Sequence, residues 1–329
     1  QLLNLDGKEI MLNETIDRLA RIVPNEDIFV VTNQEQMELT KQVSEGRLQE
    51  NHILAEPSAR NTAACIGYGA IEIIKKYGDG IMCILASDHY IKEEDTFIEV
   101  LEKAIQTVEE TDGLVTIGIK PTFSATGYGY IKNEKIEGKE YRNVIEFVEK
   151  PDLERANAYV ADGNYAWNSG MFVWKASTIL KYFEKLLPDI YEKLMLISEA
   201  LGTSSEKEIL WAIYDTIPKI SIDYGIMERA DNVYMLEGDF GWNDIGSFDA
   251  LSALYPSDEH GNVLRSDAIL VNCQDNIIIG DKKVITGVGI KDLIIVDTED
   301  ALLVCQKDKA QDVKEVVAIL EREQRKHLL

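Results

Sequence analysis

The strongest constraint on the fold is a regular alternation of strand-like and helical segments over residues 9–120. Runs of apolar and β-branched residues predict strands at 28–32, 52–57, 81–91 and 114–120. Helical spacing and propensity predict helices at 9–21, 34–46, 61–78 and 93–111. The segment 81–91 is apolar almost throughout, as is typical of a central strand covered on both faces. This alternation predicts an α/β domain in which helices wrap a mostly parallel sheet, a Rossmann-like arrangement.

The middle of the chain is more mixed. Further strands are predicted at 128–133, 143–151, 167–175 and 233–238. Helices are predicted at 152–162, over most of 176–215, at 220–230, and after a loop within 240–255. Asn61 is expected to cap the helix at 61–78 and Gly78 to end it, and Pro188 is expected to open a helix.

The character of the sequence changes after about Ser257. Short β-rich pieces separated by Gly, Asp and Asn turns follow at close spacing, and a charged helix is predicted at 308–327. Such a pattern indicates a small β domain, either a sandwich or a short β-helix, although no strict repeat period is present. We therefore expect two domains, at residues 1–256 and 257–329.

The charge balance excludes several classes of partner. The chain has 58 acidic and 34 basic residues, a formal net charge of −24, so nucleic acid and anionic membrane surfaces are not expected partners. A small anionic substrate needs local cations or a metal ion to overcome this background. The four cysteines are widely spaced, and neither a signal peptide nor a membrane-spanning run is apparent. We expect a reduced, cytoplasmic protein without disulfides or zinc.

Ligands of doubly wound sheets bind at the carboxyl ends of the strands, so the motifs that follow strands matter most. The loop EPSARNTAA at 56–64 delivers Arg60, Asn61 and Thr62 to a helix N-terminus, where free N–H groups favour anions. The alternative is that Asn61 is only a cap and Arg60 a solvated side chain.

Two aspartates are candidate ligands of a divalent metal ion. Asp88, in ILASDHYI, follows the most apolar strand, and Asp244 lies in the glycine-flanked loop GWNDIGSF. Magnesium needs only one or two protein carboxylates together with substrate phosphates. The alternatives are that Asp88 caps the next helix and that Asp244 forms a turn.

Three further motifs carry polar groups suited to a sugar phosphate. Gly129, in TGYGYI, allows close approach of the backbone to a ligand, and Asn168, in WNSGMF, has an amide suited to sugar hydroxyls. Glu149 and Lys150, in FVEKPD, are expected to close a strand and to point to its opposite faces. A bulged hairpin, turn chemistry and a surface ion pair are the respective alternatives.

Motifs of other chemistries are absent. The sequence contains no GxSxG, GxxxxGK[ST] or HExxH pattern, so an elaborate acid–base apparatus is not indicated. Phosphoryl or nucleotidyl transfer fits better, because an ionised sugar phosphate is already a nucleophile that needs positioning and charge stabilisation.

Taken in order, these motifs resemble those of the mannose-1-phosphate guanylyltransferases, a family of sugar nucleotidyltransferases. The segments that carry the resemblance are AEPSARNTAACIG, LASDHYI, TGYGYIK, FVEKPD, WNSGMFVWK, SIDYGIME, GWNDIGSF and the tail VDTEDALLVCQKDKAQDVKEVV. The resemblance implies a nucleotide-diphospho-sugar transferase domain followed by a small left-handed β-helix. It also implies the reaction of GTP with mannose 1-phosphate to give GDP-mannose and pyrophosphate.

The resemblance also implies roles for individual residues. Glu56, Arg60, Asn61 and Thr62 would lie against guanine and ribose. Gly129, Glu149 and Asn168 would contact mannose, with Lys150 at its phosphate. Asp88 and Asp244 would hold Mg²⁺ and, with Lys150, form the catalytic set.

The sequence departs from the family pattern in two places. The family opens with a strand and a glycine-rich phosphate loop, which would precede Gln1, and Ala86 and Ser87 stand where Pro and Ala are usual. We expect a protein consisting only of residues 1–329 to be nearly inactive. Alternatives are a nucleotidyltransferase for another sugar 1-phosphate and a catalytically silent nucleotide-sugar-binding subunit. An exposed β domain is suited to a homodimer contact.

Overall fold

The computed structural model describes residues 9–246, 255–280, 282–325 and 328, and it divides into two compact units. The first unit contains Ile10–Ser87 and Ile91–Trp242, and the second contains Asp88–Tyr90 and Asn243–Leu329. No helix among the described residues combines the length and the apolar character that crossing a membrane requires.

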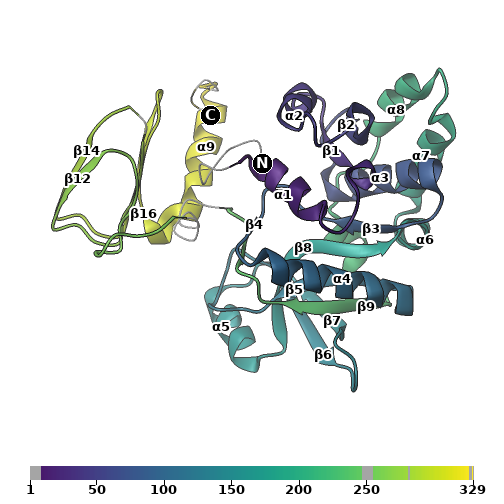
Figure 1. The fold of residues 1–329 in the computed structure, drawn as a ribbon, viewed down its shortest axis with the longest axis horizontal. Helices are drawn as coiled ribbons and strands as arrows, with labels where there is room; N and C mark the ends of the chain where they lie inside the picture. Colours follow the sequence, from purple (N-terminus) through teal and green to yellow (C-terminus); the bar gives the residue numbers. More distant parts are fainter. Residues whose placement is uncertain (1–8, 247–254, 281, 326–327, 329) are drawn as a thin grey trace. The chain divides into compact units, whose positions relative to one another are not determined.

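A six-stranded sheet organises the first unit (Figure 1). Its order is β3 (Ile81–Ile84), β8 (Tyr165–Lys175), β5 (Leu114–Ile119), β9 (Val233–Gly238), β7 (Arg142–Val148) and β6 (Tyr130–Lys135), and β6 also pairs with β8. Strands β3, β5, β6 and β9 run in one direction, whereas β7 and β8 run in the other. Most strands thus share one direction, but β8 lies between β3 and β5 and is antiparallel to both, so the sheet is mixed.

Helices cover both faces of this sheet (Figure 1). On one face, α4 (Glu94–Thr111) packs its apolar residues against Val115, Ile117 and Val173. On the other, α3 (Asn61–Tyr77), α6 (Ala176–Leu186) and α7 (Pro188–Ala200) pack around Leu114 and Trp174. Neighbouring residues such as Val173 and Trp174 therefore enter different cores, as the two-residue period of a strand requires.

The other elements of the first unit agree with the predicted alternation. They are α1 (Met11–Leu19), β1 (Val30–Asn33), α2 (Met37–Val43), β2 (Ile53–Glu56), α5 (Leu153–Asp162) and α8 (Glu206–Tyr214). Strands β1 and β2 pair in parallel. Gly78 ends α3 with a φ of 82°, and Pro188 opens α7, as predicted.

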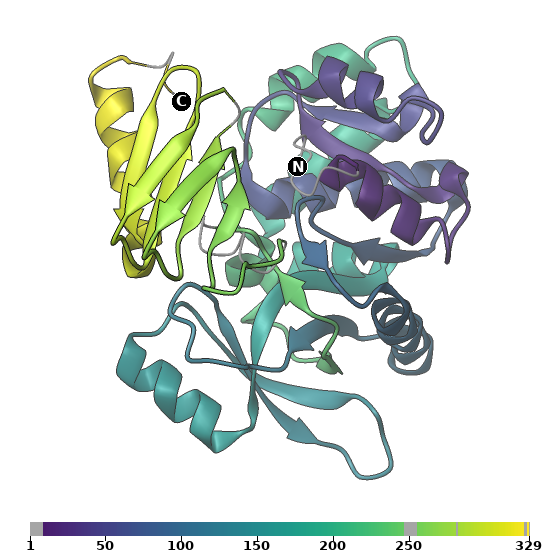
Figure 2. The same ribbon diagram turned by 60° about the vertical axis from the view of Figure 1, so that its left-hand side comes forward.

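The second unit winds into a short β-helix (Figure 2). Strands β11 (Val263–Arg265), β13 (Ile277–Gly280) and β15 (Leu293–Asp297) pair in parallel, and β16 (Leu302–Gln306) adds antiparallel to β15. A second parallel pair joins β12 (Ala268–Val271) to β14 (Ile285–Val288). The chain continues through a 3₁₀ segment, Lys307–Asp312, into α9 (Val313–Arg322). The short solenoid is confirmed, and its left-handed winding stays a prediction.

Buried asparagines connect successive turns of the β-helix. The side chain of Asn276 donates to Asn262 Oδ1 at 2.9 Å and accepts from the backbone N–H of Leu293 at 3.0 Å. Both asparagines are almost completely buried, so these bonds satisfy polar groups that water cannot reach.

The prediction of one continuous central strand at 81–91 is wrong. Strand β3 ends at Ile84, and a short strand β4 (Tyr90–Ile91) follows after the polar residues Ser87, Asp88 and His89. Within the described sheet β3 stands at the end of the strand order, although its two faces are both covered, by residues of opposite cores. Strand β4 pairs instead with β10 (Trp242–Asn243). Most of the helix expected within 240–255 lies outside the described residues.

Candidate functional site

Glu56 is the last residue of β2 and directly precedes the loop that leads to α3. Its side chain is half-buried and accepts a hydrogen bond from the Tyr214 hydroxyl, whose oxygen lies 2.5 Å from Oε1. Burial raises the pKa of Glu56, and the hydrogen bond from Tyr214 opposes that rise. The carboxylate is therefore partly shielded from water, and it has one hydrogen-bond donor in place, the Tyr214 hydroxyl.

The next residues of the loop have a conformation that the sequence did not reveal. Arg60, not Asn61, is the N-cap residue of α3, and no side chain caps this helix, so the expected capping role of Asn61 is wrong. Asn61 has a φ of 67° and accepts from the N–H of Thr62 at 2.8 Å. Asn tolerates this left-handed conformation better than most residues. Backbone strain of this kind is concentrated at functional sites.

Arg60 is directed by two partners of the same loop region. Its Nε donates to Ser58 Oγ at 3.0 Å, and its Nη2 lies 3.4 Å from the carboxylate of Asp215. Arg60 is therefore held in place and not a freely solvated side chain.

A second segment fastens this loop from the other side. Thr62 Oγ1 accepts from the N–H of Ile222 at 2.9 Å, and the N–H of Ala63 donates to the Ile220 carbonyl at 3.2 Å. The start of α3 is thus bound to the segment 220–223, which lies about 160 residues further along the chain.

The residues expected to contact a sugar, Gly129, Glu149 and Asn168, lie together near Asp223, the last residue of the segment 220–223. The N–H of Asn168 donates to the Gly129 carbonyl at 2.8 Å. A Cβ atom on Gly129 would lie 3.6 Å from the Asn168 side chain and 3.9 Å from Glu149 Oε2. The structure therefore brings Gly129, Glu149 and Asn168 together, and we call these three residues the Asn168 cluster.

Asp223 links this cluster to the loop before α3. It begins a π-helical turn, Asp223–Met227, and its Oδ1 accepts from Asn168 Nδ2 at 2.8 Å. Burial raises the pKa of Asp223, and the charge of Glu149 raises it further, whereas the bond from Asn168 opposes the rise. Burial also raises the pKa of Glu228, with contributions from Glu149 and Asp223. These three carboxyl groups repel one another at the site.

Sequence reasoning did not select Asp223 as a site residue. Its motif SIDYGIME contributes only to the resemblance, and the sequence predicts a short helix at 220–230. The available signal was a polar residue between Ile222 and Ile226, two positions that are fully buried. A half-buried acidic residue with a raised pKa is a candidate functional group.

One geometric expectation for the EKP motif is wrong. Strand β7 ends at Val148, so Glu149 and Lys150 lie beyond it, and the alternation of a strand does not set their directions. Pro151 explains the early end, because a residue preceding proline is restricted and proline itself cannot donate to a ladder. Glu149 interacts with Asp223 and Glu228, whereas Lys150 is exposed.

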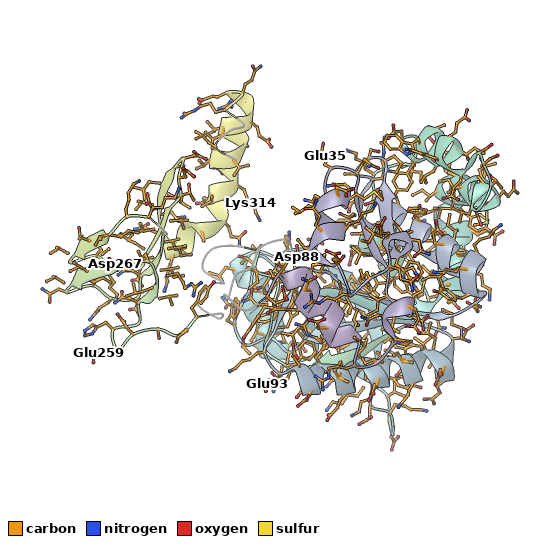
Figure 3. The ribbon with its side chains drawn as sticks, turned by 45° about the horizontal axis from the view of Figure 1, so that its top comes forward. Glu35, Asp88, Glu93, Glu259, Asp267 and Lys314 are labelled. Carbon is orange, nitrogen blue, oxygen red and sulfur yellow. The ribbon has the colours of Figure 1, made fainter. Side chains whose placement is uncertain are left out.

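Asp88 and Asp244 flank the short β4–β10 ladder. Asp88 lies in the turn between β3 and β4 (Figure 3), and Asp244 directly follows β10. The N–H of Lys92, after β4, donates to the carbonyl of Phe240, before β10. The two strands therefore run antiparallel, and both aspartates lie at the same end of the ladder although 156 positions apart (244 − 88).

This pair fits a cation that takes few protein ligands. Asp244 Oδ1 accepts from the N–H of Gly246 at 3.0 Å, which orients its carboxylate. The described residues contain no group of three or more His, Cys, Asp or Glu side chains able to hold a metal ion. Mg²⁺ matches such a site, because it is commonly held by one or two carboxylates plus substrate phosphates.

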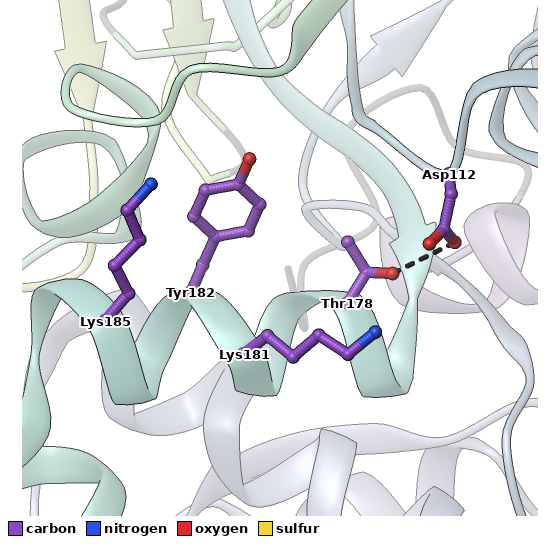
Figure 4. Close-up of a pocket in the computed structure, with 5 residues that line it drawn as sticks. All are labelled: Asp112, Thr178, Lys181, Tyr182 and Lys185. Atoms are coloured by element: carbon purple, nitrogen blue, oxygen red, sulfur yellow. Dashed lines mark hydrogen bonds between the residues drawn. The ribbon is translucent and has the colours of Figure 1, made fainter.

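A separate surface hollow of about 240 Å³ lies along α6 (Figure 4). Its lining residues are Asp112, Thr178, Lys181, Tyr182 and Lys185. Thr178 donates to Asp112, and Tyr182 and Lys185 both donate to Asp231, so most of its polar groups are paired with each other. None of the predicted site residues borders this hollow.

Comparison with known proteins identifies the class to which this fold and site belong. A family model described as nucleotidyl transferase matches residues 1–260, and one described as MannoseP isomerase/GMP-like beta-helix domain matches residues 266–320. The chain belongs to the nucleotidyl transferase family and, within it, to the group of the mannose-1-phosphate guanylyltransferases. This confirms the resemblance, the α/β fold class and the C-terminal β-helix.

Individual relatives match over nearly the whole chain. A mannose-1-phosphate guanylyltransferase of Klebsiella pneumoniae is 37% identical over 329 residues, which are 99% of this chain and 70% of that protein. A protein of the same name from Escherichia coli is 36% identical over the same shares. A crystal structure described as mannose-1-phosphate geranyltransferase from Thermus thermophilus has a TM-score of 0.84 and 32% identity, covering 95% of this chain and 90% of that chain.

The raised pKa of Asp223 predicts an inverse relation between stability and function. The pKa of Asp223 is higher in the folded protein than in the unfolded chain. At pH values between these two pKa values, the folded protein therefore binds more protons than the unfolded chain. The free energy of unfolding consequently falls as the pH rises through this range. Asp223→Asn keeps an oxygen that can accept from Asn168 and removes the charge. We expect it to raise the free energy of unfolding at pH 7 by about 1 kcal/mol while turnover falls.

Denaturant unfolding at several pH values measures this effect. The gain should disappear below about pH 4, near the ordinary aspartate pKa. Asp215→Asn is the matched control, because the pKa of Asp215 is lowered by its bonds to Ser58 and Arg60 and its removal should give no gain. A less stable Asp223→Asn protein at pH 7 would contradict the account.

Proposed function

We propose that the protein transfers a guanylyl group from GTP to mannose 1-phosphate, forming GDP-mannose and releasing pyrophosphate. The observation that carries this proposal is the continuous hydrogen-bonded connection from the loop before α3 to the Asn168 cluster. Thr62 is bound to Ile222, and the neighbouring Asp223 is bound to Asn168. A nucleotide-diphosphate sugar requires such an arrangement, with a site for the base and a site for the sugar held at a fixed separation.

The chemistry asks little of the protein beyond placement. A phosphate oxygen of mannose 1-phosphate attacks the α-phosphorus of GTP, and the bond from that phosphorus to the bridging oxygen of the β-phosphate breaks, so pyrophosphate leaves. The attacking oxygen is already ionised, so no general base is required. In-line alignment and charge stabilisation supply the rate enhancement. This agrees with the lack of base-and-nucleophile motifs in the sequence.

For the nucleotide, the proposal assigns Glu56, Arg60, Asn61 and Thr62 to guanine and ribose. Glu56 is half-buried and has one donor already in place, which suits a carboxylate that reads N–H groups of a base. Asn61 has its left-handed backbone at the start of α3, and the N-terminus of a helix favours an electronegative ligand.

For the sugar phosphate, the proposal assigns Gly129, Glu149 and Asn168 to mannose and Lys150 to its phosphate. The amide of Asn168 and the carboxylates of Glu149 and Asp223 offer donors and acceptors to hydroxyl groups. Gly129 lies beside Asn168 and Glu149, and the lack of a side chain leaves its backbone open to a sugar. Lys150 is exposed, so its ammonium group is accessible to the phosphate of a substrate that enters from solvent.

Enzymes of this family use a divalent metal ion, and we assign it as Mg²⁺ held by Asp88 and Asp244. When bound, the ion supplies positive charge to the phosphates of the substrates. Such charge is needed in a chain of net charge −24, which otherwise repels anions. We assign the transfer reaction to residues 1–256 and the β-helix to residues 257–329.

The first prediction of this proposal concerns the choice of substrates. The intact enzyme, including the phosphate loop expected before Gln1, should turn over GTP with mannose 1-phosphate faster than UTP or dTTP with glucose 1-phosphate. The reason is that Glu56 and the Asn168 cluster distinguish hydrogen-bonding patterns. A pyrophosphate-release assay across all pairs of nucleotide and sugar phosphate measures this. A preference for UTP or dTTP would refute the guanine assignment, and a preference for another hexose phosphate would refute the mannose assignment.

The second prediction concerns the metal. Asp88→Asn and Asp244→Asn should each lower kcat by about 10²–10³-fold, the range for loss of one electrostatic stabiliser. Thermal stability should hardly change, since the substitution is nearly isosteric and removes repulsion between two carboxylates. Asp239→Asn, an exposed neighbour of the same ladder, is the control and should keep wild-type activity.

Turnover and thermal midpoint must be measured on the same samples. If both aspartates are merely turn formers, the variants will keep their activity and lose stability. That combination would end the metal assignment without affecting the assignment of the nucleotide and sugar residues.

A further inference from the structure

The pairing of Tyr214 with Glu56 joins two distant parts of the first unit. Tyr214 is the last residue of α8 and is completely buried, and its hydroxyl oxygen lies 2.5 Å from Glu56 Oε1 across 158 positions of sequence. Neither sequence motifs nor the resemblance singled out this tyrosine. A hydrogen bond from a buried phenol to a half-buried carboxylate is charge-assisted and directional.

The direction of the bond follows from the surroundings. Burial and the negative charge of Glu56 raise the pKa of Tyr214 far above its ordinary value, so the phenol keeps its proton and donates it. Among the described residues no lysine or arginine forms an ion pair with Glu56, and the neighbouring Arg60 is directed to Ser58 and Asp215. Tyr214 is therefore the group that fixes the orientation of this carboxylate.

The surrounding hydrophobic core holds the tyrosine itself in place. Tyr68 of α3 packs edge-on against the Tyr214 ring, with 6.0 Å between ring centroids, and both rings are buried in the same core. Because the phenol cannot turn away, the orientation of the Glu56 carboxylate is fixed: Oε1 accepts from Tyr214 with one lone pair and keeps the other, and Oε2 keeps both, so both oxygens can accept from a ligand. An oriented carboxylate of this kind loses little conformational freedom when it binds a base.

We propose that Tyr214 is a positioning residue that orients Glu56 to accept from the two adjacent donors of guanine, N1–H and the N2 amino group, and so determines the choice of purine. This inference rests on the proposed function. A carboxylate offers two oxygens with free lone pairs to two parallel N–H groups. Hypoxanthine has N1–H but lacks the amino group, uracil presents one N–H between two carbonyls, and adenine presents an acceptor at N1, so each matches the oriented carboxylate less well.

Binding of GTP and ITP to the full protein, measured by titration calorimetry, tests the proposal. The wild type should bind GTP more tightly than ITP, since ITP leaves one carboxylate oxygen without its donor. Tyr214→Phe removes only the hydroxyl, and we expect it to weaken GTP binding about tenfold, the lower end for a hydrogen bond to a charged group. ITP binding should weaken less, so the GTP/ITP affinity ratio should fall.

The chain offers a matched control. Tyr68→Phe removes the hydroxyl of a neighbouring buried tyrosine that is hydrogen-bonded to Glu72 and not to Glu56. It should lower the thermal midpoint and leave the GTP/ITP ratio unchanged. A general effect of losing a buried hydroxyl would instead change the ratio in both variants and would overturn the positioning role.

Two more variants separate positioning from packing. In a Glu56→Gln background, which should already have a low ratio, Tyr214→Phe should have no further effect on it. Replacement of Tyr214 by 4-aminophenylalanine keeps the ring and a donor at the same position, so it should restore the wild-type ratio. This replacement also serves if Tyr214→Phe unfolds at the assay temperature, because a low ratio in the folded amino variant would overturn the proposal.

The failure of this inference and the failure of the proposed function give different results. A wild-type protein that binds UTP as tightly as GTP refutes the function. A wild type that prefers GTP, with a Glu56→Gln variant that loses the preference and a folded Tyr214→Phe variant that keeps it, refutes only the role of Tyr214.

Discussion

The candidate site has two parts, the loop before α3 and the Asn168 cluster. Both are hydrogen-bonded to one short segment, residues 220–223, and the site depends on it. Its backbone N–H at Ile222 binds Thr62, and the side chain of Asp223 binds Asn168. Ile222 itself is buried in the core that α3, α6 and α7 share, so packing holds the segment rigidly. The spacing between the loop before α3 and the Asn168 cluster is therefore set by the sheet and its helices and not by mobile side chains.

This arrangement stores unfavourable interactions at the site. Asp223 is a half-buried carboxyl near Glu149 and Glu228, Asn61 has a left-handed backbone, and Glu56 is half-buried with a phenol as its partner. Each feature costs stability in the free protein and leaves a polar group ready for a ligand. Acidic groups around a site for an anionic substrate also explain the need for a metal ion and for Lys150.

Much of the fold was predictable because it depends on local patterns. The helices that contain α3 and α4, the Pro188 start of α7 and the β-rich C-terminal unit all follow from apolar spacing and turn residues. The insertion of β8 between β3 and β5 could not be predicted, because the pairing of strands that are distant in sequence leaves no local signal. The same holds within the site: loop motifs indicated Arg60, Thr62 and Asn168, whereas Asp223 and Tyr214 act through partners 55 and 158 positions away.

The most direct test of the central claim is a crystal structure of the protein with GDP-mannose. The account predicts that guanine lies against Glu56 and Thr62, that mannose contacts Gly129 and Asn168, and that the diphosphate passes the segment 220–223. A sugar nucleotide bound with its base at the Asn168 cluster, or away from both groups, would contradict it.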